Sequence, residues 1–211
     1  NMTDSSPSSV SLMVDISVLG VGYVGLCTAV GFASRGYRVL AATHDLEKVD
    51  SLNRGVPPFF EPNLEALLGE VVRNGKLRCT ADVHEAVSGS DVTFVTVGTP
   101  SRADGSIDLR FIERSAAEIG KSLAEKDDYH LVVVKSTVIP GTTGNTVRPI
   151  VERLSGKRCG SGFGLCMSPE FLREGNAVED TLKPDRVVIG EFDRRSGDAL
   201  ENLFNEFYEG R

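Results

Sequence analysis

A glycine motif near the start of the chain constrains the fold more than any other feature. Gly20, Gly22 and Gly25 are spaced G-x-G-x-x-G, between an apolar run at 14–19 (VDISVL) and a stretch of helical period at 23–35. In such a motif the first glycine permits a tight turn and the second lets the backbone approach a pyrophosphate. The third lets helix and strand pack closely. The helix that follows offers free N–H groups to an anion, so the sequence predicts a dinucleotide-binding turn.

NAD is the cofactor predicted for this turn. The alternative is a glycine-rich turn in a Rossmann-like fold that binds another ligand. The residues predicted to contact the cofactor here are Gly20, Gly22, Tyr23, Val24 and Gly25.

The rest of the chain alternates between short β-branched runs and stretches of helical period. Strands are predicted at 14–19, 38–42, 91–97, 131–134 and 186–190, with weaker candidates at 77–80 and 163–167. Helices are predicted at 23–35, 45–54, 62–73, 82–88, 108–125, 141–154 and 194–208. Runs such as LVVV are apolar on both faces, as in a sheet covered on both sides. We therefore predict an α/β fold, a Rossmann-like doubly wound, mostly parallel sheet with helices on both faces.

Composition and charge limit the classes of protein to which the chain can belong. The 211 residues are 40% hydrophobic and 25% charged, and we expect a disordered tail or cloning remnant at 1–12 and one dinucleotide-binding domain at 13–211. The net charge of -7 argues against a nucleic-acid partner. No apolar run reaches the ~20 residues of a membrane span. The four cysteines lack C-x-x-C spacing, so we expect reduced thiols, a cytoplasmic protein and no metal site.

The end of the second predicted strand bears on the choice between NAD and NADP. An acidic residue here usually binds the adenosine ribose, but this chain has Thr43, with Asp45 two residues later and Lys48 one helical turn beyond. Thr43 can hydrogen-bond a ribose hydroxyl but does not repel a 2′-phosphate. NAD is expected, with Thr43, Asp45 and Lys48 at the cofactor. The alternative for Asp45 is the N-cap of the helix at 45–54.

Six sequence blocks resemble one family of enzymes. They are GVGYVGL, EPNLEALL, VGTPSRADGSIDL, KSTVIPGTT, MSPEFLREG and KPDRVVIG, in this order. The order is that of the nucleotide-sugar 6-dehydrogenases, the UDP-glucose and GDP-mannose dehydrogenases, which use two NAD⁺ to oxidise a primary alcohol to a carboxylate. The resemblance spans residues 14–208. It implies the N-terminal NAD-binding domain of such an enzyme, without the central helix and the second Rossmann-like domain, and a role in nucleotide-sugar metabolism and polysaccharide biosynthesis.

The resemblance also implies roles for two loops that follow predicted strands. Gly98 and Thr99 should lie along the cofactor, with the Thr99 hydroxyl near ribose or phosphate. Ser136 should approach the nicotinamide, and Thr137 should contact the cofactor and help to hold a water beside Glu170. The alternative for Ser136 and Thr137 is to cap the helix that begins near Pro140.

The segment CMSPEFLREG contains the carboxylates that the resemblance makes catalytic. Glu170 would act as general base or orient water for hydrolysis of a thioester, and Glu174 would polarise the sugar or tune Glu170. The backbone from Phe171 through Leu172 to Arg173 would hold the sugar and its phosphates, together with both glutamates. The two glutamates share a face if the segment is helical, but Pro169 and Gly175 make a loop equally expected. Arg173 could instead be the ion-pair partner of a glutamate.

The cysteine of this segment is not the expected nucleophile. The family's nucleophile lies in a GGxCxPKD segment, which the 211 residues do not contain, and Cys166 ends a predicted strand as a packing residue. We therefore expect the chain alone to bind dinucleotide without turnover. The block KPDRVVIG favours UDP-glucose as substrate, and the block VGTPSRADGSIDL also resembles the GDP-mannose enzymes.

Other readings remain open from the sequence. A non-catalytic NAD(H)-binding module is one, although the intact SPEFLREG argues against it. Another Rossmann dehydrogenase, of the 6-phosphogluconate or 3-hydroxyacyl-CoA type, shares only the turn. The family resemblance implies a homodimer for the full-length enzyme, whose main contact uses the central helix, and leaves the state of this chain open.

Overall fold

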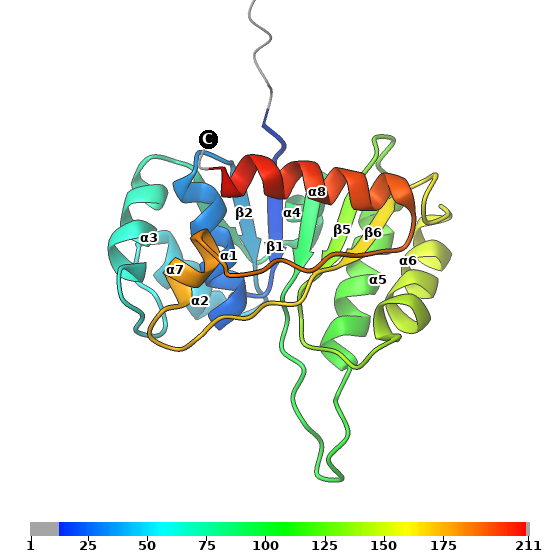
Figure 1. The fold of residues 1–211 in the computed structure, drawn as a ribbon, viewed down its shortest axis with the longest axis horizontal. Coiled ribbons are helices and arrows are strands. Elements are labelled where there is room, and N and C mark those ends of the chain that lie inside the picture. The colour runs from blue at the N-terminus through cyan, green and yellow to red at the C-terminus, as the bar shows by residue number, and fades with distance from the viewer. Residues whose placement is uncertain (1–12, 210–211) are drawn as a thin grey trace, which may run out of the picture.

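The structure, a computed structural model, describes residues 13–209. It contains one seven-stranded sheet of order β3-β2-β1-β4-β5-β6-β7 (Figure 1). The strands are β1 (Ile16–Leu19), β2 (Val39–Ala42), β3 (Leu77–Thr80), β4 (Val92–Val95), β5 (Leu131–Val134), β6 (Gly164–Met167) and β7 (Gly190–Glu191). The first six pair in parallel and only β7 is antiparallel. The predicted doubly wound, mostly parallel fold is confirmed.

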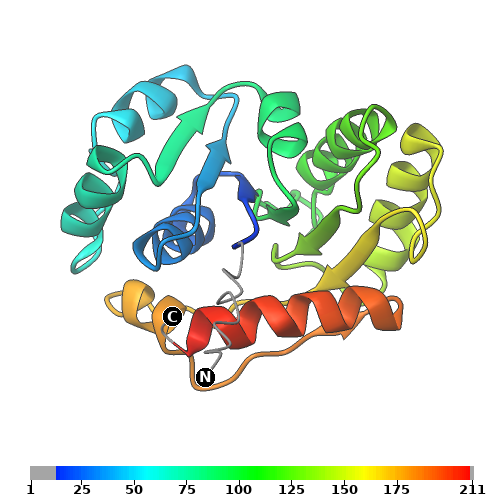
Figure 2. The same cartoon turned by 90° about the horizontal axis from the view of Figure 1, so that it is seen from above.

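Helices cover both faces of this sheet (Figure 2). They are α1 (Tyr23–Ser34), α2 (Leu46–Asn53), α3 (Leu64–Arg73), α4 (Val83–Ser88), α5 (Arg110–Ala124), α6 (Arg148–Ser155), α7 (Ala177–Leu182) and α8 (Arg194–Tyr208), with a π-helical turn, η1 (Thr143–Val147), before α6. Apolar side chains of α1, α3 and α8 pack on one face, and those of α4, α5 and α6 pack on the other. None of the helices within residues 13–209 has the length and apolarity needed to cross a bilayer.

The strands supply both cores because successive side chains point to opposite faces. In β5, Leu131 and Val133 lie in the core under α1 and α8, whereas Val132 and Val134 lie in the core under α5 and α6. All four are almost fully buried. This is the two-sided burial that the run LVVV predicted.

The strand order reverses between β1 and β4, and this reversal positions the site. β1 pairs in parallel with β2 on one side and with β4 on the other. The loops that leave these strands therefore diverge at their carboxyl ends and open a crevice, which is where ligands bind in open α/β sheets.

The prediction of a strand at 186–190 is wrong. Only Gly190 and Glu191 form a strand, which pairs with the end of β6, while Val187 and Val188 are each 41% exposed. The carbonyl of Val188 accepts a hydrogen bond from the Ser168 side chain (2.8 Å) in place of a strand partner. The β-branched run is thus an extended connection that is bonded to Ser168, not an inner strand.

Two other elements differ from the prediction. The short helix α7 was not predicted. The predicted helix at 141–154 is divided into η1 and α6. Pro149, near the start of α6, has no N–H to donate to the carbonyl four residues earlier, which accounts for the wider turn before it. The predicted tail at 1–12 lies outside the described residues.

Candidate functional site

The glycine turn joins β1 to α1 at the strand reversal. Gly20 has φ +98°, in the region that favours glycine. A Cβ built on Gly25 would lie 1.9 Å from the Gly20 carbonyl oxygen and 2.5 Å from Thr96 Oγ1, so only glycine fits there. A Cβ on Gly22 would meet no described atom within 4 Å. The turn is therefore closed toward the sheet and open above Gly22, where α1 begins with N–H groups that lack helical partners.

A cleft of about 510 Å³ lies above this turn. Its walls come from the carboxyl ends of β1, β2, β4 and β5. Every residue predicted to contact the cofactor lines the cleft except Gly25, which lies behind the turn. The lining residues from this set are Gly20, Gly22, Tyr23, Val24, Thr43, Asp45, Lys48, Gly98, Thr99, Ser136 and Thr137. The open turn and the volume fit a dinucleotide, with its pyrophosphate over the start of α1.

The second β-strand ends at the side of the cleft where an adenosine ribose would lie. Asp45 caps α2, and its carboxylate accepts hydrogen bonds from the N–H groups of Glu47 (3.1 Å) and Lys48 (3.2 Å). The Thr43 hydroxyl accepts from the Asp45 N–H (3.2 Å). The capping alternative for Asp45 is thus confirmed, and its carboxylate is already engaged by α2.

Helix α5 brings charged residues to the same side of the cleft, and the sequence analysis did not find them. Arg114 donates to Glu118 (3.1 Å), which also contacts His44 Nε2 (3.0 Å). All three line the cleft. Their sequence signal is weak, because an i,i+4 pair such as Arg114 and Glu118 is common on exposed helix faces. Only the packing of α5 beside α4 brings Glu118 to His44, next to Thr43.

The loops after β4 and β5 are tied together beside the cleft. The Thr99 hydroxyl donates to the Thr137 carbonyl (2.7 Å), and the Ser136 hydroxyl donates to the Val97 carbonyl (2.7 Å). Neither Ser136 nor Thr137 caps a helix, since η1 begins only at Thr143 and its N-cap is Thr142. The capping alternative is therefore wrong. Among residues 13–209, no hydrogen bond ends on the Thr137 hydroxyl, which leaves this exposed group free for a ligand or a water.

The segment Ser168–Gly175, here called the substrate segment, leaves β6 as an irregular loop with a turn at Glu174. It is not helical, so Glu170 and Glu174 do not share a helix face. Glu170 accepts a hydrogen bond from the Leu172 N–H (2.6 Å). Phe171 is 44% exposed and lies beneath the Arg186 guanidinium, 4.1 Å from its ring centre.

Arg173 is held by α7 and by no glutamate. Its guanidinium donates to both carboxylate oxygens of Asp180 (2.8 and 3.1 Å), and its N–H also donates to Asp180 (2.9 Å). This pair holds the pKa of Asp180 below its usual value. The expected alternative of an Arg173–glutamate pair is wrong. The pairing leaves the backbone of the substrate segment, more than the Arg173 side chain, available to a ligand.

Lys135 lies between the cleft and the substrate segment. It follows β5, and its side chain lines both the cleft and a separate cavity of about 170 Å³ behind Glu170. Burial lowers the pKa of Lys135 to about 8, and the Glu170 carboxylate opposes this shift. The carboxylate predicted to be catalytic and the predicted cofactor cleft therefore share one cationic wall, which the sequence analysis missed.

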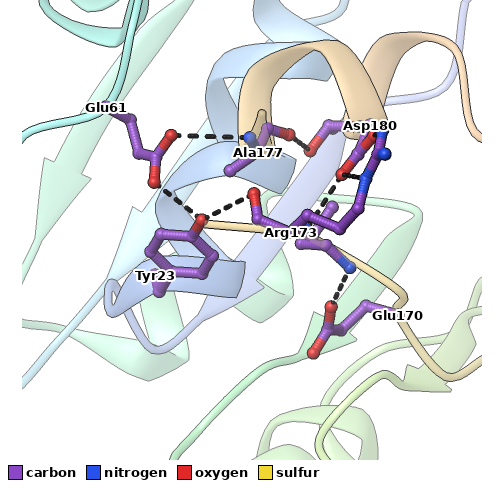
Figure 3. Close-up of polar contacts among 8 residues, drawn as sticks. Tyr23, Glu61, Glu170, Arg173, Ala177 and Asp180 are labelled. Atoms are coloured by element: carbon purple, nitrogen blue, oxygen red, sulfur yellow. Dashed lines mark hydrogen bonds and ion pairs between the residues drawn. The ribbon is translucent and has the colours of Figure 1, made fainter. Parts of the chain in front are cut away.

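Glu61 is a second residue that the sequence analysis did not assign to the site. It lies between α2 and α3 and is 3% exposed. Its carboxylate accepts hydrogen bonds from the Tyr23 hydroxyl (2.7 Å) and from the Ala177 N–H (3.5 Å) (Figure 3). It also accepts from the Gly175 N–H (3.0 Å). The only sequence signal was its place in the block EPNLEALL, quoted above for the resemblance.

The four cysteines are free and carry no sign of a nucleophile. Cys166 is fully buried in the core under α1 and α8, and burial raises its pKa to about 12. Burial also raises the pKa of Cys27 to about 12 and that of Cys79 and Cys159 to about 11. All four are protonated near neutral pH, and a thiol is a poor nucleophile. Cys166 is a packing residue, as predicted.

Comparison with known proteins identifies relatives of this chain. The model of the UDP-glucose/GDP-mannose dehydrogenase family, NAD binding domain, matches residues 14–208. GDP-mannose 6-dehydrogenase of Pseudomonas aeruginosa is 46% identical over 191 residues, which are 90% of this chain and 44% of that protein. UDP-glucose 6-dehydrogenase AglM of Haloferax volcanii is 44% identical over 196 residues, which are 93% of this chain and 45% of that protein.

Solved structures agree with the sequence relatives. A ternary complex of GDP-mannose dehydrogenase from Pseudomonas aeruginosa superposes with a TM-score of 0.88 at 46% identity, over 90% of this chain and 44% of that one. A UDP-glucose dehydrogenase from Pyrobaculum islandicum gives a TM-score of 0.88 at 43% identity, over 95% of this chain and 46% of that one. The chain thus spans less than half the length of the relatives it matches.

Proposed function

Because the chain belongs to the UDP-glucose/GDP-mannose dehydrogenase family and matches its NAD-binding domain, we propose that residues 13–211 serve as the NAD-binding half of a nucleotide-sugar 6-dehydrogenase. The reaction would oxidise the primary alcohol of a nucleotide-linked hexose to a carboxylate with two NAD⁺. One observation carries the proposal. The glycine turn that is open over Gly22 and the substrate segment with Glu170 lie at the same edge of the sheet, and Lys135 lines the space beside both.

The cleft residues supply binding and orientation. NAD⁺, when bound, accepts the hydride that leaves the oxidised carbon. The N–H groups at the start of α1 would bind the pyrophosphate. The Thr99 and Ser136 hydroxyls donate to loop carbonyls, which holds the loops after β4 and β5 in position. Both residues also line the cleft, where their hydroxyl oxygens would accept hydrogen bonds from the cofactor. Thr137, whose hydroxyl is exposed, remains the candidate for a ligand-bound water.

Glu170 is proposed as the carboxylate that takes a proton from the attacking water. One of its oxygens accepts from the Leu172 N–H, which fixes the carboxylate at the wall of the cavity and leaves the other oxygen to orient water. Formation of the acid removes two hydrides and adds the oxygen of one water. Phe171, Leu172, Arg173 and Glu174 would form the wall against the sugar and its phosphates, chiefly through backbone groups.

UDP-glucose is the proposed substrate, supported by the block KPDRVVIG at 183–190. GDP-mannose is the second candidate. It is supported by the sequence identity of the GDP-mannose relative to this chain, which at 46% is slightly above the 44% of the UDP-glucose relative. The proposed working unit is a homodimer of a longer protein that adds a cysteine-containing second domain. We propose a cytoplasmic location, in keeping with the four free thiols.

Calorimetric titration of the 211-residue chain tests the cofactor. We expect saturable binding of NAD, and no NADH formation from UDP-glucose or GDP-mannose, because the chain offers no reactive thiol. Failure to bind NAD would contradict the proposed cofactor. NADH formation by the chain alone would contradict the proposal that the reactive thiol lies in a second domain.

Steady-state kinetics of a protein that joins this chain to the second domain test the substrate and Glu170. We expect two NADH per UDP-glucose and slower turnover of GDP-mannose. Glu170→Gln should lose most of the turnover, by about 100-fold or more if it removes a general base, and should keep NAD affinity. Glu201→Gln, an exposed carboxylate on α8, is the matched control. Unchanged turnover in Glu170→Gln would remove Glu170 from the mechanism.

A further inference from the structure

The buried carboxylate of Glu61 joins two parts of the site that are far apart in the sequence. On one side it accepts from the hydroxyl of Tyr23, which lies in the glycine turn and lines the cofactor cleft. On the other side it accepts from the N–H groups of Gly175 and Ala177, where the substrate segment enters α7. Figure 3 shows Glu61 with Tyr23 and with Ala177 at the start of α7. A single side chain thus contacts both the turn and the segment.

Glu61 is ionised in this position. The N–H of Gly175, followed by the Tyr23 hydroxyl, holds the pKa of Glu61 below its usual value. Partial burial, followed by the Glu61 carboxylate, raises the pKa of Tyr23, so the phenol keeps its proton. The contact is therefore a hydrogen bond from a neutral hydroxyl to an anion, which is stronger than one between neutral groups. It persists through the neutral pH range.

The same hydroxyl also reaches the substrate segment directly. Tyr23 Oη lies 3.1 Å from the Arg173 carbonyl oxygen and 2.7 Å from Glu61. A phenol has one hydrogen, and the charged acceptor at the shorter distance takes the larger share of it. Any shift of Tyr23 therefore changes its bonds to Glu61 and to Arg173 together.

Within the part of the chain that the structure describes, the substrate segment has no other polar contact with the first half of the chain. Within residues 13–209, the hydrogen bonds from 169–177 to residues before β4 all end on Tyr23 or Glu61. The other polar contacts of the segment stay within the second half of the chain. Ser168 bonds to Val134 and Val188, and the pairs Arg173–Asp180 and Glu170–Leu172 are local. An irregular loop with few ties opens at low free-energy cost, so these bonds decide how firmly the segment is held.

We propose that Glu61 is a positioning residue that couples the cofactor turn to the substrate segment. A dinucleotide that orders the glycine turn also orders Tyr23, and through Glu61 it holds Gly175 and the segment before it in the conformation that receives the nucleotide sugar. Cofactor occupancy thereby prepares the sugar site. The inference rests on the proposed function in one respect, that NAD binds at the glycine turn.

Amide hydrogen exchange of the 211-residue chain, with and without saturating NAD, tests the coupling. In the unmodified chain we expect NAD to slow exchange at 20–27, the turn itself, and by about fivefold or more at 172–178. Glu61→Gln keeps the size of the side chain but replaces one acceptor oxygen with an NH₂ group. This variant should keep the protection at 20–27 and lose the protection at 172–178.

Three further variants make the test specific. Tyr23→Phe removes only the hydroxyl and should give the same loss at 172–178, so the test stands even where Glu61→Gln folds poorly. The variant that carries both substitutions should lose no more protection at 172–178 than either single variant, because Tyr23 and Glu61 act in one chain of contacts. Glu65→Gln, an exposed carboxylate one helical turn further on, is the matched control and should behave like the unmodified chain.

The outcomes separate this inference from the proposed function. Absence of protection at 20–27 in the unmodified chain would overturn NAD binding at the turn. Protection at 20–27 without any at 172–178 would overturn the coupling alone. Protection at 172–178 that survives in both Glu61→Gln and Tyr23→Phe would show that NAD reaches the segment without Glu61, and would equally overturn the proposal.

Discussion

The two ends of the central sheet carry similar polar residues and use them in opposite ways. At the carboxyl ends of β1, β4 and β5, glycines, threonines and serines surround an open cleft. Toward the amino ends of the same strands, Ser17 and Thr93 are paired across β1 and β4 and are fully buried. Their hydroxyl oxygens lie 2.7 Å apart. Hydroxyl groups on the same two strands thus face a cleft at one end and a closed interior at the other.

The closed end forms one continuous hydrogen-bonded chain. Lys126 Nζ contacts His130 Nδ1 (2.9 Å), and His130 Nε2 contacts Thr93 Oγ1 (2.7 Å). Ser90 completes the chain by donating to Ser17 Oγ (2.9 Å). Each buried polar group here has a partner, as interior polar groups need. The end of the strand at which a hydroxyl group lies, more than its residue type, therefore decides whether it is available to a ligand or stabilises the fold.

Substitution of the glycines at the open end should have the largest effect. Gly25→Ala places a methyl group 1.9 Å from the Gly20 carbonyl, so the turn must open. We expect NAD affinity to fall about 100-fold or more, which is ~2.7 kcal/mol, and overpacking to cost about 1–3 kcal/mol of stability. Calorimetric titration and urea unfolding measure the two losses.

Gly22→Ala is the matched variant for this prediction. Its φ of −72° suits alanine, and the added methyl meets no described atom within 4 Å. The free energy of unfolding should change by less than about 0.5 kcal/mol, while NAD affinity falls because the methyl occupies the approach of the pyrophosphate. Normal NAD binding by Gly25→Ala, or equal unfolding losses in both variants, would contradict the account of the turn.

At the closed end we predict a pH effect on stability with no effect on binding. Burial, followed by the Lys126 ammonium, lowers the pKa of His130 to about 3. An unfolded histidine titrates near ~6.5, so between these values the unfolded chain binds the extra proton. Stability is therefore complete above about pH 6.5 and decreases as the pH falls toward 3, by about 2 kcal/mol from this group at pH 5.

His130→Gln should reduce this pH dependence. Urea unfolding at pH 7.5 and pH 5 measures it in both proteins, and the difference between their pH slopes isolates His130. The variant loses stability at both pH values but should lose less between them. NAD affinity should stay within about twofold, because His130 does not line the cleft. A variant with the same pH slope as the unmodified chain would refute a buried neutral His130.

Much of the fold could be predicted from the sequence because local signals were consistent. The glycine spacing fixed the first turn, and apolar runs such as LVVV located the inner strands. The run RVVIG led to a wrong strand prediction because β-branched residues favour extended backbone of any kind. Only the position of the run relative to the sheet distinguishes a connection at the edge from a strand.

Sequence reasoning located the lining of the cleft where one motif supplies all of its groups, and missed residues where distant segments meet. The residues proposed to contact the cofactor lie in turns whose sequence is characteristic. The roles of Glu61 and Lys135 depend on how EPNLEALL and the end of β5 pack against the substrate segment. No local sequence pattern predicts that packing. The alternative of a glutamate partner for Arg173 was wrong for the same reason, since Asp180 reaches it only through the position of α7.

The smallest predicted effect concerns the side of the cleft beside Thr43. Asp45 caps α2, Glu118 is bonded to His44 and Arg114, and Lys48 and Arg114 line the same cleft. Among the described residues of the cleft, a 2′-phosphate therefore meets no carboxylate without a partner. We expect NADP to bind within about tenfold of NAD, or ~1.4 kcal/mol, by calorimetry. Thr43→Asp should widen the gap beyond tenfold by repelling the phosphate, whereas Asp45→Asn, which keeps a good N-cap, should leave it unchanged. A gap far beyond tenfold in the unmodified chain would mean that Asp45 or Glu118 enforces NAD despite its existing bonds, and that the open end is less open than its geometry indicates.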